Sequence, residues 1–287
     1  SFGLIVIFFA FRIRVCYYQA FHIRYFMLYE RKSQSRKALF LVFLTDICYN
    51  SVMIYNIADL KVKINNKYSF TDKLCADYLS ENQDSSDIEV TAGAEEIAKE
   101  KALSPNFPDG YIENICLYRE ICNRMPVRNR FLLHSAVVEY GGAAYAFLGR
   151  SGTGKSTHTG IWLKNLPSAK ILNGDKPIIG YAGGEFTVYG TPWQGKERLG
   201  YNGKAPLKGL CFLEQAKKNE IAKLSPGQAA ERLFVQILLP DDPEAVGKTL
   251  ELCDELVKTV PSYLLKCDIS DEAFEKSFAA LTKGEPT

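Results

Sequence analysis

The sequence predicts an α/β protein in which a mixed β-sheet with flanking helices carries a glycine-rich loop. Segment 149–156 reads Gly-Arg-Ser-Gly-Thr-Gly-Lys-Ser, and an apolar run at 144–148 precedes it. The run 155–166 contains no proline and stops before Pro167, as expected of a helix that follows the loop. A Gly-Gly pair at 141–142 separates two apolar runs, which favours a tight hairpin turn. We therefore expect the strand that enters the loop to pair antiparallel with the strand before it.

The loop has the GxxxxGK[ST] pattern of a Walker A motif, which binds the phosphate groups of nucleotides. Its glycines let successive backbone N–H groups turn inward, and the following helix presents its positive end to the same anion. Lys155 would reach the β- and γ-phosphates, and the Ser156 hydroxyl would bind Mg²⁺. The residues predicted to bind the nucleotide here are Gly149, Ser151, Gly152, Thr153, Gly154, Lys155, Ser156 and Thr157, the last supporting the α-phosphate.

Before the loop, the pattern predicts a smaller α+β part over residues 53–129. The second half of 54–64 alternates apolar and polar residues, which favours one half-buried strand. In 111–124 the apolar residues recur at helical spacing, and in 94–102 the acidic residues come first, as the helix dipole favours. The expected elements are a strand at 54–64, a short helix at 71–79, a strand at 88–91, helices at 94–102 and 111–124, and a strand at 132–140.

After the loop, short β-like runs are separated by Gly and Asp, and helices alternate with them toward the end. Ser225, Pro226 and Gln228 have the residue types of a helix start: a cap, a first-turn proline and a capping-box partner. The expected strands are 143–148, 169–173, 176–181, 185–189, 207–213, 221–224 and 262–268, and the expected helices are 155–166, 227–238, 243–258 and 271–283. Together they predict a nucleotide-binding core over 130–287.

Composition narrows the function classes. The formal net charge of +2 gives no reason to expect a nucleic-acid partner. The 8 cysteines are scattered without a CxxC pair or a His-linked metal spacing, which indicates reduced thiols in a cytoplasmic protein. The apolar runs at 4–11 and 38–44 are too short or too interrupted by arginine to span a bilayer, and no secretory signal is evident. We therefore expect no membrane partner.

Residues 1–52 differ in character from the rest of the chain. The chain begins at Ser1, and Met53 opens a more regular pattern. One interpretation is that this segment lies outside the main fold, as an upstream translation or an appendage. The alternative is an extra helical element or a contact with a lipid surface, because Phe, Tyr and Arg are interleaved there.

Four segments together resemble a known family. They are Leu-His-Ser-Ala at 133–136, Gly-Lys-Ser-Thr-His-Thr-Gly at 154–160, Asn-Gly-Asp-Lys-Pro at 173–177 and Gly-Thr-Pro-Trp-Gln-Gly-Lys at 190–196. With the hairpin before the loop, they are similar to an uncharacterised bacterial subgroup of the HPr kinase/phosphorylase-like branch of the phosphoenolpyruvate carboxykinase fold. The resemblance covers about residues 130–280, whereas the part before it is similar only in general character.

The resemblance implies ATP and Mg²⁺ as ligands and transfer of a phosphoryl group to a hydroxyl. It assigns Asp175 as the carboxylate near the γ-phosphate, acting as a base or, with Ser156, as a metal ligand. Asp175 also follows an apolar strand about twenty residues after Lys155, where a second metal-binding segment is expected. HPr kinases usually carry a second acid just before this one, where the chain has Gly174. Reversible phosphorylase chemistry and HPr as the acceptor are therefore not expected.

Two histidines near these motifs receive different interpretations. His134 matches a histidine that lies near the phosphates in the HPr kinases, so it joins Asp175 and Lys155 as a catalytic candidate. The alternative is that His134 is a hydrogen-bonded core histidine. His158 lies on the helix after the loop, and we expect it to be structural.

The loop at 190–196 combines glycine, proline, tryptophan and lysine, a mixture that can wrap a ligand. Trp193 would stack on a base or cover an acceptor, and the alternative is that it closes the edge of the core. Lys196, or Arg198, would neutralise phosphate charge in the transition state. Arg232 is a weaker candidate for a phosphate contact. Glu214 ends an apolar run and is a rival for the Walker B carboxylate, ranked below the match to the family.

The leading hypothesis is a kinase that transfers the γ-phosphoryl group of Mg-ATP to a hydroxyl of a small molecule, a peptide or a protein serine. The alternative is a non-catalytic module of the same fold that senses a nucleotide or acts as a scaffold. A decarboxylating carboxykinase is disfavoured because the sequence lacks a convincing set of metal-binding His, Lys and Asp residues. Motifs of the LSGGQ and NKxD types are absent, which argues against transporter ATPases and GTPases. Relatives of this fold often form oligomers, so a homo-oligomer is also expected.

Overall fold

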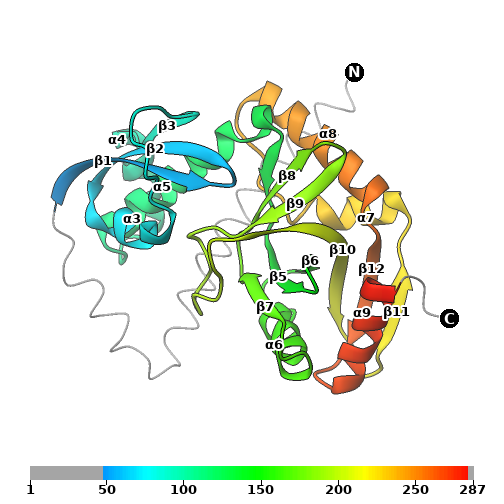
Figure 1. The fold of residues 1–287 in the computed structure, drawn as a ribbon. Helices are drawn as coiled ribbons and strands as arrows, with labels where there is room; N and C mark the ends of the chain where they lie inside the picture. Colours follow the sequence, from blue (N-terminus) through cyan, green and yellow to red (C-terminus); the bar gives the residue numbers. More distant parts are fainter. Residues whose placement is uncertain (1–47, 284–287) are drawn as a thin grey trace.

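The computed structural model describes residues 48–283, which form a mixed α/β protein with two β-sheets (Figure 1). The first sheet has the strand order β1-β2-β3. Its strands are β1 (Cys48–Ile57), β2 (Leu60–Tyr68) and β3 (Ile88–Thr91), and we call residues 48–128 the N-terminal part. Of the segment 1–52 that the sequence sets apart, residues 48–52 belong to β1 and the others lie outside the described residues.

The single strand expected at 54–64 is wrong, because this stretch is a hairpin. β1 and β2 pair antiparallel around a turn at Ala58 and Asp59, whose φ angles of 53° and 58° are left-handed. The pair lacks the glycine or asparagine that such a turn usually contains, so Asp59 alone is a weak turn signal. Residues that are distant in sequence stabilise the turn. Arg130 Nε donates to the Ala58 carbonyl at 2.6 Å, and Lys204 Nζ pairs with Asp59 Oδ2 at 2.6 Å.

Three helices pack in the N-terminal part: α3 (Ser69–Leu74), α4 (Ala94–Leu103) and α5 (Asp109–Arg124). The helix expected at 71–79 is shorter, because it ends at Leu74 and a separate 3₁₀ turn follows at Ala76–Tyr78. Of the apolar residues that recur at helical spacing in α5, Ile112, Cys116 and Ile121 are buried as predicted, whereas Ile115 and Tyr118 are half-buried.

The second sheet of the described residues has nine strands and is curled. Its path runs β4-β8-β9-β10-β6-β5-β7, with β12 pairing both β10 and β11. The strands are β4 (Arg130–Leu132), β5 (Ser135–Tyr140), β6 (Ala143–Leu148), β7 (Lys170–Asn173), β8 (Ile178–Ala182), β9 (Glu185–Tyr189), β10 (Lys204–Gln215), β11 (Glu220–Lys223) and β12 (Ser262–Cys267). The predicted hairpin is confirmed: β5 and β6 pair antiparallel around Gly141 and Gly142, whose φ angles are 60° and 75°.

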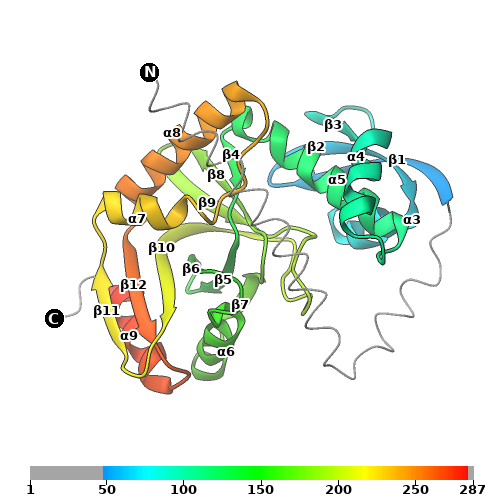
Figure 2. The same ribbon diagram turned by 180° about the vertical axis from the view of Figure 1, so that it is seen from behind.

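Helices cover both faces of this sheet (Figures 1 and 2). On one face α6 (Lys155–Asn165) and α9 (Asp271–Lys283) share a buried cluster that includes Trp162 and Phe274. On the other face α7 (Pro226–Leu233) and α8 (Pro243–Thr259) pack onto a second cluster through Leu233 and Leu256. The predicted helix starts are confirmed, and Ser225 and Gln228 form the expected capping box.

Two elements differ from the sequence prediction for one shared reason. The strand expected at 132–140 is split, because Leu133 and His134 lie between β4 and β5. The helix expected at 227–238 ends at Leu233. In both cases the chain turns so that Leu133 can bridge to Ile237, while the His134 N–H donates to the carbonyl of Gln236 at 2.7 Å. This long-range pairing has no local sequence signal.

The two sheets are joined by a common apolar core. Ile178 and Trp193 come from the later part of the chain, yet both belong to the cluster built on β1, β2 and α5. Asn202 Nδ2 donates to the Asp77 carbonyl at 2.8 Å across the same junction. Within residues 48–283, every helix is too short or too polar to cross a lipid bilayer.

Candidate functional site

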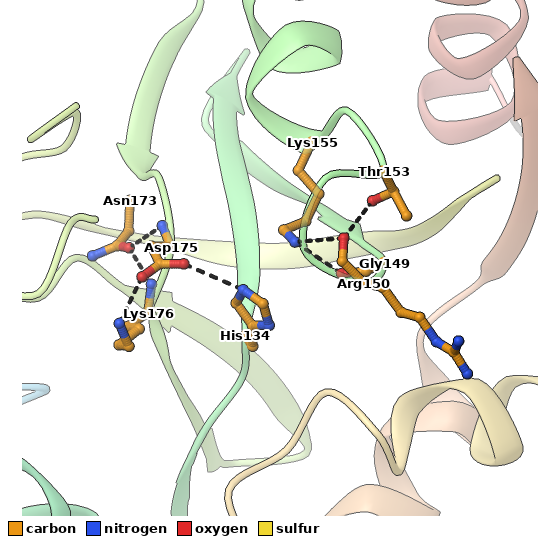
Figure 3. A network of polar contacts seen from close by, with 8 residues as sticks. All are labelled: His134, Gly149, Arg150, Thr153, Lys155, Asn173, Asp175 and Lys176. Atoms are coloured by element: carbon orange, nitrogen blue, oxygen red, sulfur yellow. Dashed lines mark hydrogen bonds and ion pairs between the residues drawn. The ribbon is translucent and has the colours of Figure 1, made fainter. Parts of the chain in front are cut away.

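The topology gathers the predicted site residues at one edge of the second sheet (Figure 3). β6 and β10 are parallel, and β5 runs antiparallel to both β6 and β7. Consequently the carboxyl ends of β6, β7 and β10 and the start of β5 meet at the same edge. The glycine-rich loop follows β6, Asp175 follows β7, and His134 precedes β5. In Figure 3 His134 stands between Asp175 and the loop.

The loop between β6 and α6 has a backbone that requires glycine. Gly149, Gly152 and Gly154 have φ angles of 155°, 84° and 101°, which side chains rarely adopt. A Cβ at Gly149 would lie 2.6 Å from Thr153 Oγ1, so the loop closes tightly on itself. Thr153 Oγ1 in turn donates to the carbonyl of Arg150 at 2.8 Å. The expected strand before the loop and helix after it are both confirmed.

Lys155 points back into the loop. Its Nζ donates to the carbonyls of Gly149 at 2.8 Å and Arg150 at 3.4 Å, and the residue is 8% exposed. Burial lowers the pKa of this ammonium to about 8, although the charge of Asp175 acts in the opposite direction. Burial disfavours the charged form of Lys155, and a nearby anion would stabilise that form. Phosphate oxygens would therefore compete well with the two carbonyl groups for this ammonium. Ser151, Ser156 and Thr157, by contrast, are exposed.

The backbone at Asp175 is fixed by its neighbour Asn173, which is fully buried. Asn173 Oδ1 accepts the N–H groups of Asp175 at 2.9 Å and Lys176 at 2.8 Å. Its Nδ2 donates to Thr191 Oγ1 at 3.0 Å, and the Thr191 hydroxyl donates to the Lys176 carbonyl at 2.7 Å. The turn that carries the candidate carboxylate is therefore anchored on both sides.

Both oxygens of Asp175 have partners. Oδ1 accepts from His134 Nε2 at 3.2 Å, and Oδ2 accepts from Lys176 Nζ at 2.7 Å. Burial opposes the charge of Asp175, but Lys176 and His134 outweigh it and hold the pKa of the carboxyl well below its usual range. Burial and the charge of Lys155 lower the pKa of His134 despite Asp175, so the imidazole is neutral and its contact is a hydrogen bond.

The long connection 190–203 lies over this turn. The Gly174 N–H donates to the Leu199 carbonyl at 2.9 Å, and a Cβ at Gly195 would lie 2.9 Å from the Cβ of Asp175. At Gly174 a Cβ would lie 3.2 Å from the carbonyl oxygens of both Gln194 and Leu199. The position that would carry a second acid thus has backbone oxygens against it and little room for a side chain.

Trp193 does not lie on an open surface. It is 7% exposed, its ring centroid is 4.6 Å from that of Tyr118 on α5, and its Nε1 donates to Asn114 Oδ1 at 3.4 Å. This is the core-edge arrangement that the sequence left as an alternative to stacking on a ligand. Lys196 and Arg198 are exposed at the tip of the same connection, next to the glycine that touches Asp175.

The rival candidates pair with each other or are buried elsewhere. Glu214 Oε1 accepts from Arg232 Nη1 at 2.6 Å, with both side chains about 40% exposed. Glu214 nevertheless ends the strand beside β6, and the neighbouring Gln215 Nε2 donates to the Gly152 carbonyl at 3.0 Å. His158 is 3% exposed, and its Nε2 lies 3.0 Å from Ser277 Oγ, as expected for a structural histidine.

Sequence reasoning missed three functional contributors. Lys176, next to Asp175, gives no local signal because a lysine before a proline is usually a solvated surface residue. Asn173 carried a usable signal: an asparagine two residues before the carboxylate is typical of a turn that caps backbone N–H groups. Tyr118, on α5, is 58 residues upstream of Lys176, so its approach to the site depends on tertiary packing.

The residues present suit Mg²⁺ held jointly with phosphates. Among residues 48–283 no group of three or more His, Cys, Asp or Glu side chains could enclose a metal ion. Mg²⁺ is commonly held by one or two protein oxygens together with substrate phosphates and water, which matches a hydroxyl at Ser156 and a carboxylate at Asp175. To bind the ion, Asp175 must exchange at least one of its present partners.

Comparison of the chain with models of protein families gave no match, and neither did comparison with curated protein sequences. The relation to the HPr kinase-like branch therefore stays a prediction that rests on sequence motifs.

Proposed function

We propose that the protein is an ATP-dependent phosphotransferase that acts on a hydroxyl group. The observation that carries this proposal is the meeting of the glycine-rich loop and Asp175 at one sheet edge, close enough that the charges of Asp175 and Lys155 influence each other. A phosphate-binding loop alone fits any nucleotide-binding protein. A carboxylate held beside that loop is what transfer to a hydroxyl needs in addition.

Each residue has a stated task in this proposal. The loop N–H groups and Lys155 bind the phosphates, and Ser156 with Asp175 holds Mg²⁺ or orients the acceptor. Mg²⁺, when bound, neutralises phosphate charge. His134 donates its Nε2–H to Asp175 and so keeps the carboxylate turned toward the loop. The acceptor oxygen forms a bond to the γ-phosphorus, the bond to the bridging oxygen breaks with its electron pair going to ADP, and Asp175 takes the acceptor proton.

A second candidate function is a nucleotide-sensing or scaffold module without catalysis. The observation that favours it is that both oxygens of Asp175 are engaged, by His134 and Lys176. A carboxylate held so firmly in its charged form is a weak base. We rank this second because Asp175 stands beside the phosphate-binding loop together with Lys155 and Ser156, and binding of a nucleotide alone does not require that carboxylate.

The test is ATP turnover with a panel of hydroxyl acceptors: free serine, small peptides and cell extract. We expect extract to stimulate ADP release by the wild type, and Asp175→Asn to abolish turnover while nucleotide binding remains. Lys155→Ala should lower binding itself. Asp271→Asn is the matched control, because Asp271 also pairs with a lysine, Lys164 at 2.8 Å, but far from the loop in sequence and on the surface. Tight binding of Mg-ATP without turnover in any fraction would favour the sensing module.

Localisation and assembly belong to the same proposal. Six cysteines, Cys75, Cys116, Cys122, Cys211, Cys253 and Cys267, are unpaired thiols, and of these six Cys253 is the most exposed. Unpaired thiols are what a reducing compartment maintains, so we place the protein in the cytoplasm. Homo-oligomer formation stays a prediction from the resemblance.

A further inference from the structure

Lys176 lies at the centre of the site, although it stands outside the glycine-rich loop and no role was predicted for it from the sequence. Its Nζ is 2.7 Å from Asp175 Oδ2, and its side chain retains 35% of its exposure against 23% for Asp175. Both side chains of the pair therefore keep contact with solvent. The pair lies at an accessible edge and is not sealed in the core.

The backbone of Lys176 is held on both sides by side chains. The N–H donates to Asn173 Oδ1 at 2.8 Å, and the carbonyl accepts from Thr191 Oγ1 at 2.7 Å. The ammonium is guided by an aromatic face, because Nζ lies 5.9 Å from the ring centroid of Tyr118. That ring packs against Trp193 at 4.6 Å. Helix α5 of the N-terminal part thus forms one wall around this lysine.

Charge around Asp175 is unbalanced in favour of cations. Two ammonium groups, Lys155 and Lys176, and the neutral imidazole of His134 act on one carboxylate. An ammonium has three N–H donors, and among the described residues Asp175 accepts one from Lys176. When Asp175 binds a metal or takes a proton, it no longer balances Lys176. A partly buried ammonium without an anion is costly, so another anion is required beside it.

We propose that Lys176 is a second phosphoryl-binding lysine. Its ammonium exchanges Asp175 for the terminal phosphate of the bound nucleotide, and Tyr118 positions Lys176 for this exchange. The inference rests on the proposed function, because it needs a nucleotide on the loop. It goes beyond it by adding a catalytic residue outside the glycine-rich loop and a positioning residue from the N-terminal part. In the transfer step Lys176 follows the phosphoryl oxygens while the acceptor proton passes to Asp175.

The experiment compares binding of ADP with binding of the non-hydrolysable imido analogue of ATP, both with Mg²⁺, by calorimetry. We expect Lys176→Met to lower the preference for the analogue about 10- to 100-fold, the effect of losing one charge-assisted hydrogen bond, and to leave ADP binding within about 2-fold. Lys204→Met is a close control, because Lys204 also has an aspartate at 2.6 Å and an aromatic ring, that of Tyr189, at 5.8 Å. It should change neither affinity.

Two variants of Tyr118 distinguish a role in positioning Lys176 from a role in packing. Its hydroxyl interacts with the buried thiol of Cys122 and not with the ammonium of Lys176, so Tyr118→Phe should keep the preference for the analogue. Tyr118→Leu removes the aromatic face and should lower that preference about 3- to 10-fold, as expected for one cation–π contact, with little change in ADP affinity. A loss of affinity for both nucleotides alike would indicate a structural role and would contradict positioning.

A measurement on the wild type tests the same inference without depending on whether the variants fold. Acetylation of lysines by a water-soluble reagent is followed by mass spectrometry with ADP or with the imido analogue. The analogue should protect Lys176 more than ADP does, whereas Lys204 should be labelled equally in both. Equal labelling of Lys176, or an unchanged preference in Lys176→Met, overturns the inference while the phosphotransferase proposal stands. If the wild type binds neither nucleotide, both proposals fail together.

Discussion

Replacing Asn173 by alanine should destabilise the protein and misplace Asp175 at once. Asn173 is fully buried, and its side chain accepts the N–H groups of Asp175 and Lys176 and donates to Thr191. Alanine leaves two part-buried backbone N–H groups and the Thr191 oxygens without this partner. At about 1–2 kcal/mol for each unsatisfied N–H, the free energy of unfolding should fall by about 2–4 kcal/mol.

The assay is equilibrium unfolding in urea, followed by circular dichroism, with Asn65→Ala as the control. Asn65 also makes two side-chain hydrogen bonds, to Glu89 and Thr91 at 3.0 Å each, but it does so at the exposed surface. Its loss should cost less than about 1 kcal/mol because water replaces those partners. In the folded Asn173→Ala protein, ADP affinity should stay near that of the wild type while turnover drops. A stability equal to that of the control would refute the view that Asn173 fixes this turn.

Three further predictions follow. Gly195→Ala should abolish turnover and lower thermal stability in a melting experiment, because φ is +77° and the new Cβ would lie 2.9 Å from that of Asp175; unchanged turnover would show that the connection gives way. Glu214→Gln should change the free energy of unfolding by less than about 1 kcal/mol, as its pair with Arg232 is well exposed, and leave turnover within 3-fold. A loss of more than about 100-fold on kinetic assay would instead mark it as the metal carboxylate. Burial lowers the pKa of His158 from 6.5 to about 4, so the unfolded chain binds its proton first as the pH falls. Stability should therefore drop by roughly 3 kcal/mol between pH 6.5 and 4, and in metal-free buffer His158→Gln should flatten this part of the urea-derived profile; an identical slope in both proteins would contradict it.

The sequence predicted those parts of the site that depend on local chain geometry. Three glycines at fixed spacing define the loop, and the Gly-Gly pair defines the hairpin, because both need left-handed backbone that other residues avoid. Asp175 was assigned from the family resemblance, and its position shortly after an apolar strand supported that assignment. All of these signals lie within a few residues of the feature that they predict.

The partners of Asp175 were not predictable in the same way. Lys176 is its neighbour in sequence, yet nothing in the sequence shows whether that ammonium turns to the carboxylate or to solvent. Tyr118 reaches the same place from α5, through the packing of two sheets on one core. The turn at Ala58 and Asp59 was missed for a related reason. Its two left-handed residues are bound by Arg130 of β4 and Lys204 of β10, which belong to the second sheet and lie far away in sequence.

The glycine at position 174 shows how structure gives a physical reason for a sequence observation. From the sequence alone, Gly174 is noted only because it stands where HPr kinases usually carry an acidic residue. In the structure the connection 190–203 brings two carbonyl oxygens, of Gln194 and Leu199, to 3.2 Å from the place of a Cβ. A carboxylate there would face these oxygens at close range and without a cation beside them, since Lys176 already pairs with Asp175. The same connection is anchored through Trp193 to α5, so the single-carboxylate character of this site depends on how the N-terminal part holds the connection in place.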